Sequence, residues 1–206
     1  MMLMTEPELN LEAQPEKRQG PFLIVGLGNP GRKYELNRHN VGFMVLNHLS
    51  IKLGESFGKV ETKALISKTI YKGERVILVK PQTYMNNSGM SVSSLARFYQ
   101  VPLDNLLVAY DDVDLPLGIL RLRPSGGSAG QKGMQSIIER LGTDQFPRLR
   151  IGTGRPPGRM DAADYVLQDF PAQETDLLNE TLDRAVEAVL IFIQDGLDKA
   201  MNLYNG

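Results

Sequence analysis

The sequence predicts an α/β fold: a single domain in which a mixed, twisted sheet is flanked by helices. Short apolar stretches with strand character alternate with longer amphipathic stretches, a pattern typical of sheets built largely from parallel strands. Two strands, 64–71 and 75–81, are joined by only three residues, so they are expected to form an antiparallel hairpin that makes the sheet mixed. The length of 206 residues fits one domain with one core.

Each predicted strand is a short apolar run bounded by turn residues. The first, 22–27, ends next to glycine, and 105–113 becomes acidic at its end. Pro116 and Gly118 mark the turn before the next strand. The predicted strands are 22–27, 64–71, 75–81, 105–113, 119–123 and 148–154.

The predicted helices carry apolar residues at helical spacing. In 41–53, His48 falls in line with the apolar face, which indicates a structural role for this histidine. Ser88 is expected to cap the next helix, which must stop before Pro102. A glycine-rich loop at 124–133 opens the third helix. The predicted helices are 41–53, 88–100, 134–142, 172–194 and 197–204.

Composition excludes several classes of protein. There is no run of about 18 apolar residues, so no membrane span is predicted. The lack of cysteine excludes disulfides, thiolate metal sites and a cysteine nucleophile, and it suits the cytoplasm. With only two histidines, a three-histidine metal site is also excluded. Residues 1–20 are polar and match neither a secretory nor a transit pattern, so they are expected to form a disordered tail before a folded domain at 21–206.

Charge is strongly segregated along the chain, although the net charge is only −1. Residues 121–159 contain eight basic and two acidic side chains, a net charge of +6, whereas residues 160–206 contain ten acidic and two basic side chains, a net charge of −8. A basic segment inside a nearly neutral chain fits a partner with a phosphate backbone. The same arginines also fit an ordinary solvated surface, so charge alone leaves nucleic-acid binding open.

Polar side chains follow three of the predicted strands. Asn29 comes after the first strand, Asn86 after the third, and Asp111 at the end of the fourth. Ligands of open α/β sheets bind beyond the carboxyl ends of strands, so two amides and a carboxylate are expected at one rim if these strands are neighbours. His39, in the loop after the first strand, is able to reach the same rim.

Together these residues fit a hydrolytic site. A carboxylate orients an imidazole and stabilises its protonated form while the other ring nitrogen takes a proton from water, a device worth about 10²–10⁴ in rate. Amide side chains donate to a developing oxyanion. The set suits an activated ester, since no covalent nucleophile with its own base is evident. Each residue alone also fits a simpler role. His39 fits a surface histidine, the asparagines fit turn residues, and Asp111, Asp112 and Asp114 fit solvated charges at a strand end.

Two glycine-rich segments resemble nucleotide-binding motifs. Residues 26–31 match the G-x-G-x-x-G pattern of NAD(P)-binding folds, but the polar stretch after Gly31 does not open an amphipathic helix. An NAD(P)-binding protein therefore remains only an alternative. The loop 126–133 lacks the spacing of a P-loop, although its backbone amides and Lys132 at a helix start fit an anion.

Five segments form a set of motifs in order along the chain. They are IVGLGNPGRKYELNRHNVGF at 24–43, KPQTYMNNSG at 80–89, VAYDDVDLPLG at 108–118, GGSAGQKGMQSIIERLGT at 126–143 and FPRLRIGTGRPPG at 146–158. This set closely resembles the motifs of bacterial-type peptidyl-tRNA hydrolases. The resemblance extends over 22–204 and implies that 21–206 is a catalytic domain. The domain would hydrolyse the ester between an N-blocked peptide and the 3′ end of tRNA, without a metal or cofactor.

The resemblance also implies a role for each strand-end residue. His39 would be the general base, and Asp111 would orient it. Asn29 would contact the peptide beside the ester, and Asn86 would hold the substrate or the attacking water. The family enzyme is a cytoplasmic monomer that recycles tRNA from prematurely released peptidyl-tRNA. Further residues expected to bind substrate or tRNA are Tyr34, Tyr84, Lys132, Arg148 and Arg150.

The fourth motif departs from the pattern of many family members. They carry G-H-N-G, with the asparagine contacting substrate, where this chain has Gly130-Gln131-Lys132-Gly133. Lysine does not accept a hydrogen bond as an amide does, but it neutralises phosphate. One further alternative is a non-catalytic RNA-binding protein, like the relatives that plant organelles use in intron splicing. The intact strand-end residues and the lack of a transit pattern argue for the enzyme.

Overall fold

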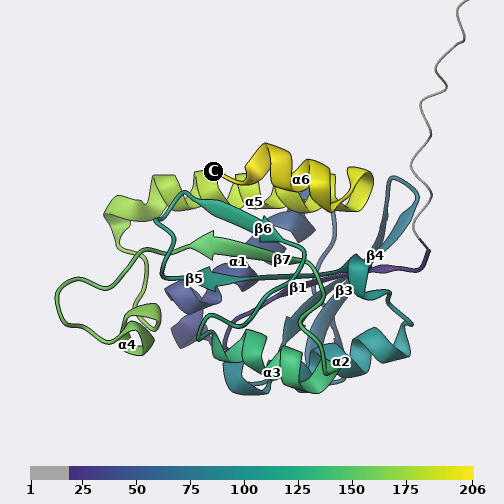
Figure 1. Ribbon diagram of the computed structural model, residues 1–206, viewed down its shortest axis with the longest axis horizontal. Helices are drawn as coiled ribbons and strands as arrows, with labels where there is room; N and C mark the ends of the chain where they lie inside the picture. The colour runs from purple at the N-terminus through teal and green to yellow at the C-terminus, as the bar shows by residue number, and fades with distance from the viewer. Residues whose placement is uncertain (1–18) are drawn as a thin grey trace, which may run out of the picture.

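A seven-stranded mixed sheet forms the centre of the protein in a computed structural model that describes residues 19–206 (Figure 1). The strand order is β2-β3-β4-β1-β5-β7-β6, in which β4, β1, β5 and β7 run parallel and the other strands are antiparallel to their neighbours. The predicted mixed α/β sheet is confirmed, with β2 as an additional short edge strand. The strands are β1 (Phe22–Gly26), β2 (Lys59–Glu61), β3 (Ala64–Tyr71), β4 (Glu74–Pro81), β5 (Leu106–Asp112), β6 (Leu120–Arg123) and β7 (Arg148–Gly152).

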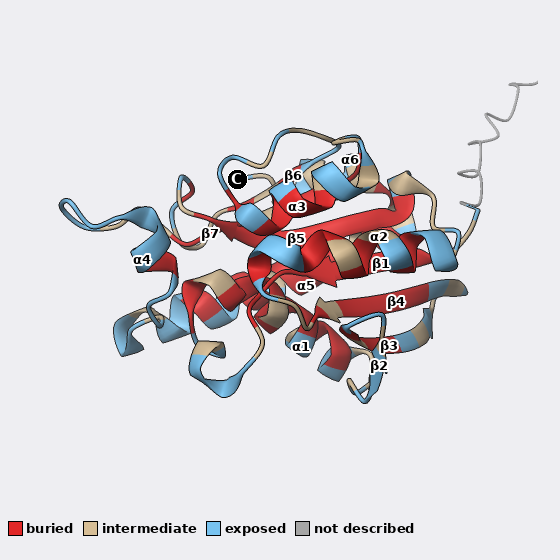
Figure 2. Ribbon diagram, turned by 90° about the horizontal axis from the view of Figure 1, so that it is seen from below, coloured by how far each residue is buried: buried red, intermediate tan, exposed pale blue. Residues whose placement is uncertain are grey.

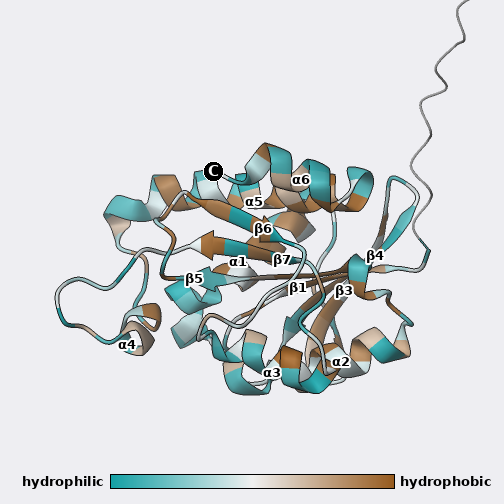
Figure 3. Ribbon diagram, viewed as in Figure 1, coloured by the Kyte–Doolittle hydropathy of each residue, from teal (hydrophilic) through white to brown (hydrophobic). Residues whose placement is uncertain are grey.

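Helices cover both faces of the sheet, so the core has two layers. Helices α1, α5 and α6 pack on one face and α2 and α3 on the other, and the strands between them are the most buried and most hydrophobic part (Figures 2 and 3). No helix among residues 19–206 combines the length and apolar character needed to cross a membrane. The helices are α1 (Val41–Lys52), α2 (Ser88–Phe98), α3 (Lys132–Leu141), α4 (Ala162–Val166), α5 (Thr175–Asp195) and α6 (Leu197–Tyr204).

Two local features differ from the predictions. Ser88 does not cap α2: a 3₁₀ turn, η3 (Met85–Asn87), precedes the helix, so the Ser88 hydroxyl lies inside the first turn and donates to the Met85 carbonyl at 2.9 Å. His48 is partly exposed and not part of the apolar core, although its Nδ1 lies 3.2 Å from Asp183 of α5, a contact between helices that fits the structural role expected of it.

The predicted disordered tail, residues 1–20, falls outside the described residues except for its last two. The Gln19 carbonyl accepts a hydrogen bond of 3.0 Å from the Asn105 side chain. Gly20 lies against the ring of Pro102. The first described residues therefore lie beside the segment that leads into β5.

The N-terminus of α1 lies directly against the sheet because glycine stands on both sides of the contact. A Cβ atom at Gly26 would come within 2.2 Å of the Gly42 carbonyl oxygen, and one at Gly42 would come within 2.4 Å of the Ala109 carbonyl oxygen. After the glycine pattern the chain enters a 3₁₀ turn, η1 (Arg32–Tyr34), and not the long helix of a dinucleotide site. The glycines thus serve packing, which fixes His39, just before α1, beside β5.

We expect Gly42→Ala to destabilise the fold, because the added methyl group would meet backbone atoms of β5 and of the segment after β1. The free energy of unfolding, measured by urea denaturation, should fall by about 1–3 kcal/mol or more. Gly58→Ala is the matched control, since its added Cβ would meet nothing within 4 Å. Equal destabilisation by both variants would contradict the packing account.

Candidate active site

The carboxyl ends of three neighbouring strands meet at one rim of the sheet. Strands β4, β1 and β5 are adjacent, Asn86 and Asn29 follow the first two, and Asp111 lies near the end of the third. A cavity of about 510 Å³ at this rim is lined by all three residues together with His39. The structure therefore brings together the four residues that the strand-end pattern singles out.

His39 and Asp111 form a buried pair at the centre of the rim. Nδ1 of His39 lies 2.8 Å from Oδ2 of Asp111, and the two side chains are 13% and 4% exposed. The histidine is carried by a 3₁₀ turn, η2 (Arg38–Asn40), and the aspartate by β5. Because an ionised carboxylate only accepts hydrogen bonds, the proton of the neutral ring lies on Nδ1. This leaves Nε2 as the free acceptor of a residue that lines the cavity.

Gln131 completes the surroundings of the carboxylate. Its Nε2 donates to Oδ1 of Asp111 at 3.1 Å, and its Oε1 accepts from the backbone N–H of Met134 at 2.8 Å, which makes it the N-cap of α3. One amide therefore links the carboxylate to the start of a helix. Sequence reasoning missed this role: a position before a predicted helix signals a cap, but nothing in it reveals a contact with a strand 20 residues earlier.

Asn29 is held on two sides. Its Oδ1 accepts from the backbone N–H of Met85 at 2.9 Å. The side chain of Asn40 accepts from the Asn29 N–H at 2.8 Å and donates to the Asn29 carbonyl at 3.0 Å. The Asn29 NH₂ group is thus the part of the side chain left to donate in the cavity. Asn40 is a second residue that sequence reasoning missed, because its role in holding the Asn29 backbone is visible only from these contacts.

Four of the predicted substrate-binding residues divide into two groups. Asn86, Tyr84 and Lys132 are exposed and line the cavity. Tyr34 is not among the lining residues, and the Lys33 ammonium lies over its ring at 4.7 Å. The cavity therefore includes three of these four positions.

Two chemically different walls enclose the cavity. The glycine-rich loop contributes the polar and basic stretch 128–132. A second, apolar part of the lining comes from the region of α4, which lies beyond the carboxyl ends of β5 and β7 (Figure 1). It consists of Ala162, Ala163, Val166 and Leu167. A substrate with one anionic and one apolar part fits between such walls.

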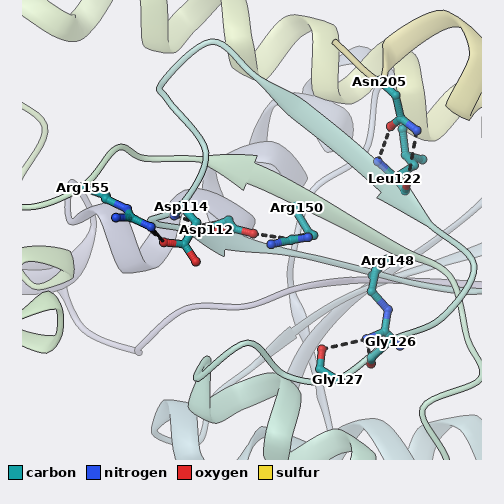
Figure 4. Close-up of polar contacts among 9 residues, drawn as sticks. All are labelled: Asp112, Asp114, Leu122, Gly126, Gly127, Arg148, Arg150, Arg155 and Asn205. Atoms are coloured by element: carbon teal, nitrogen blue, oxygen red, sulfur yellow. Dashed lines mark hydrogen bonds and ion pairs between the residues drawn. The ribbon is translucent and has the colours of Figure 1, made fainter.

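The two arginines of β7 are engaged by the protein itself (Figure 4). Arg148 is 1% exposed, and its guanidinium donates to the carbonyls of Gly126 and Asp144, the latter at 2.6 Å. Burial lowers the pKa of Arg148 below its ordinary value. Arg148 thus holds the base of the glycine-rich loop and is poorly placed for the phosphate contact expected of it. The Arg150 side chain is 23% exposed and pairs with Asp112. Asp112 is buried, so the expectation of a solvated acid at this position is wrong.

An α/β sheet with a histidine–carboxylate pair and amide donors at its strand ends defines a class of hydrolytic enzymes that rely on general-base catalysis. Among residues 19–206, no group of three or more histidine, aspartate or glutamate side chains is placed to hold a metal ion. A family model described as peptidyl-tRNA hydrolase matches residues 23–206. The chain belongs to the peptidyl-tRNA hydrolase family.

Individual relatives agree with this assignment. The chain is 51% identical over 185 residues to the peptidyl-tRNA hydrolase of Chloroflexus aggregans, covering 89% of this chain and 98% of that one. It is 47% identical over 209 residues to the chloroplastic peptidyl-tRNA hydrolase of Arabidopsis thaliana, covering 98% and 73%. The crystal structure of peptidyl-tRNA hydrolase from Acinetobacter baumannii superposes with a TM-score of 0.85 at 35% identity, covering 90% of this chain and 95% of that one.

We expect Gln131→Glu to lower kcat by at least about 10-fold, because a second carboxylate replaces the donor that faces Asp111. The helix cap survives, since a carboxylate oxygen still accepts from Met134, but thermal stability should also fall at neutral pH, because two buried carboxylates then face each other. The loss should be smaller at low pH, because two adjacent carboxyl groups share a proton more readily as pH falls.

The matched control is Gln135→Glu, which adds the same charge to the same helix beside Glu139 but away from Asp111. Its kcat should stay close to that of the wild type at every pH. A Gln131→Glu enzyme with unchanged kcat would show that the Gln131 contact does not matter for the reaction.

Proposed function

We propose that this chain is a peptidyl-tRNA hydrolase that cleaves the ester between an N-blocked peptide and the 3′ end of tRNA. In the cell it recycles tRNA from peptidyl-tRNA released prematurely from translation. The observation that carries the proposal is the buried His39–Asp111 pair beside Asn29 and Asn86 in one cavity. Family membership supplies the substrate class.

His39 acts as the general base in this proposal. Its Nε2 takes a proton from a water molecule while the water oxygen attacks the ester carbonyl carbon. Asp111 stabilises the imidazolium that forms, through the Nδ1 hydrogen bond of 2.8 Å. The tetrahedral intermediate then collapses: the bond from the carbonyl carbon to the ribose oxygen breaks, His39 returns its proton to that oxygen, and the peptide forms as a carboxylic acid, which loses its proton to solvent.

The asparagines orient the substrate. The free NH₂ group of Asn29 donates to the peptide carbonyl next to the ester, and Asn86 holds the substrate or the attacking water. A peptide amide satisfies the buried Asn29 group, whereas a free amino group does not. Because an unpaired buried polar group is costly, this contact favours N-blocked substrates over free aminoacyl-tRNA.

The tRNA lies on the face of the sheet that carries α3. Side chains alternate along β6, so Leu120 and Leu122 join the core under α5 and α6, while Arg121 and Arg123 point to the α3 side. Lys132 extends the same basic face to the rim of the cavity. The opposite face carries α5, which is rich in acidic residues, so electrostatics orients a polyanion toward α3.

We further propose that the enzyme works as a cytoplasmic monomer. The four residues proposed to act on the substrate, Asn29, His39, Asn86 and Asp111, all line one cavity of the same chain, which supports a monomeric enzyme. A sequence without cysteine suits a reducing compartment. One relative is named as chloroplastic, so the fold alone does not fix the compartment.

We expect the protein to release N-acetyl-aminoacyl groups from tRNA in EDTA, and free aminoacyl groups far more slowly. His39→Ala should lower kcat by at least about 10² while tRNA binding persists. His48→Ala is the matched control, because that histidine pairs with Asp183 away from the cavity, and it should keep near-wild-type turnover.

Two outcomes of this assay would contradict the proposal. Near-wild-type turnover in His39→Ala would show that His39 is not the general base. No release by the wild type, with tRNA still bound, would favour a non-catalytic RNA-binding protein on the same fold.

We expect Lys132→Ala to raise KM for full-length substrate several-fold, and to reduce the slope of log affinity against log salt by about 1, because one phosphate contact is lost. On a minimal substrate, an N-blocked ester of the terminal nucleotide, the effect should be small. Lys199→Ala is the control, since Lys199 lies on α6 and pairs with Asp195. Equal losses on both substrates would refute the phosphate role.

A further inference from the structure

Arg38, the residue before His39, is a buried cation whose partners come from the other end of the chain. Its side chain is 5% exposed. Nη1 donates to the Asp169 carbonyl at 2.6 Å, and Nη2 pairs with Glu174 at 2.8 Å. The backbone N–H of Arg38 donates to the Gln168 carbonyl at 3.0 Å. Nothing in the proposed chemistry uses this guanidinium, so its role needs a separate explanation.

Two aromatic rings hold the same guanidinium. Its central carbon lies 4.4 Å from the centre of the Tyr165 ring and 4.9 Å from that of Phe170. A cation over an aromatic face is attracted by the ring quadrupole, more strongly when both are desolvated. The Tyr165 hydroxyl in turn donates to the Thr153 carbonyl at 3.2 Å, just after β7. Arg38 therefore sits at the junction of η2, α4 and the segment after α4.

The segment that Arg38 holds is also the apolar wall of the cavity. Tyr165 belongs to α4, and its neighbours Val166 and Leu167 line the cavity. A helix of five residues has too few internal hydrogen bonds to be stable alone, so its position depends on outside anchors. Asn37 adds a second anchor, because its side chain donates to the Asp169 carboxylate at 2.6 Å.

We propose that Arg38 is a positioning residue that sets the apolar α4 wall relative to His39 and thereby determines how the enzyme binds the peptide part of its substrate. Two consecutive residues of the turn η2 make these contacts: the Arg38 side chain contacts α4, and the His39 side chain contacts Asp111. The polyanionic tRNA belongs at the Lys132 wall, so the peptide side chains meet the α4 wall. The inference rests on the proposed function for the identity of the ligand.

The chemistry of arginine suits this role better than stabilisation alone. A buried ion pair is weak evidence for stability, because well-packed apolar replacements are often neutral or stabilising. A guanidinium is a planar fork that binds a carbonyl and a carboxylate at once while it lies over aromatic rings. Lysine keeps the charge but supplies only a compact ammonium. Arg38→Lys therefore separates the charge from the geometry.

The test compares wild type with Arg38→Lys on two tRNA substrates, one carrying a single N-acetyl-amino acid and one an N-acetylated apolar tripeptide. We expect KM for the tripeptide substrate to rise about 10-fold, with KM for the single-residue substrate within about 2-fold and the pH profile of kcat unchanged. Hydrogen exchange of amides 162–168, measured without substrate, should become at least about 10-fold faster.

Arg184→Lys is the matched control, because Arg184 also donates to a backbone carbonyl, that of Gly118, but contacts neither α4 nor the cavity. It should change neither the KM ratio nor the exchange of 162–168. Glu174→Gln, which keeps a hydrogen-bond acceptor, tests the same anchor without touching η2.

Two results would overturn the inference: unchanged exchange at 162–168 in Arg38→Lys, or an equal rise in KM for both substrates. If the wild type released neither substrate, the proposed function would fail. The exchange measurement would still decide whether Arg38 holds α4.

Discussion

The buried carboxylate of Asp111 is the group on which the rest of the site depends. An anion so far from water must be fully hydrogen-bonded, and here one oxygen meets His39 and the other meets Gln131. These contacts join three elements that are distant in sequence: the turn before α1, strand β5 and the start of α3. The carboxylate that binds His39, the proposed base, therefore also binds Gln131 at the end of the glycine-rich loop.

Backbone packing and charge distribution both serve this arrangement. Glycines at 26 and 42 let α1 approach the sheet closely enough for His39 to reach β5. The buried guanidinium of Arg148 donates hydrogen bonds to the carbonyls of Gly126 and Asp144. These bonds hold the start of the glycine-rich loop, which ends at Gln131 and Lys132. The sheet also separates charge, with acidic α5 on one side and the arginines of β6 on the side of α3.

Local patterns in the sequence were sufficient for the fold class and for the meeting of Asn29, Asn86 and Asp111, because the carboxyl ends of neighbouring parallel strands share a rim. They were insufficient wherever a role depends on a distant partner. The role of Gln131 is visible only through its contact with Asp111. The role of Arg38 is visible only through partners such as Glu174, which lies 136 positions further along the chain. Arg148 reads as a surface arginine in an alternating strand, but the glycine-rich loop covers it. The short elements β2 and α4 carry too few residues to show a period.

We propose that Asp111 holds His39 in the tautomer that leaves Nε2 free to take a proton. The direct measurement is the ¹⁵N chemical shifts of the His39 ring in the uniformly labelled protein at a pH where the ring is neutral, assigned with His48→Gln because the chain has only two histidines. We expect the shifts of a protonated Nδ1 and an unprotonated Nε2. A ring protonated on Nε2, or a rapid mixture of both forms, would contradict it.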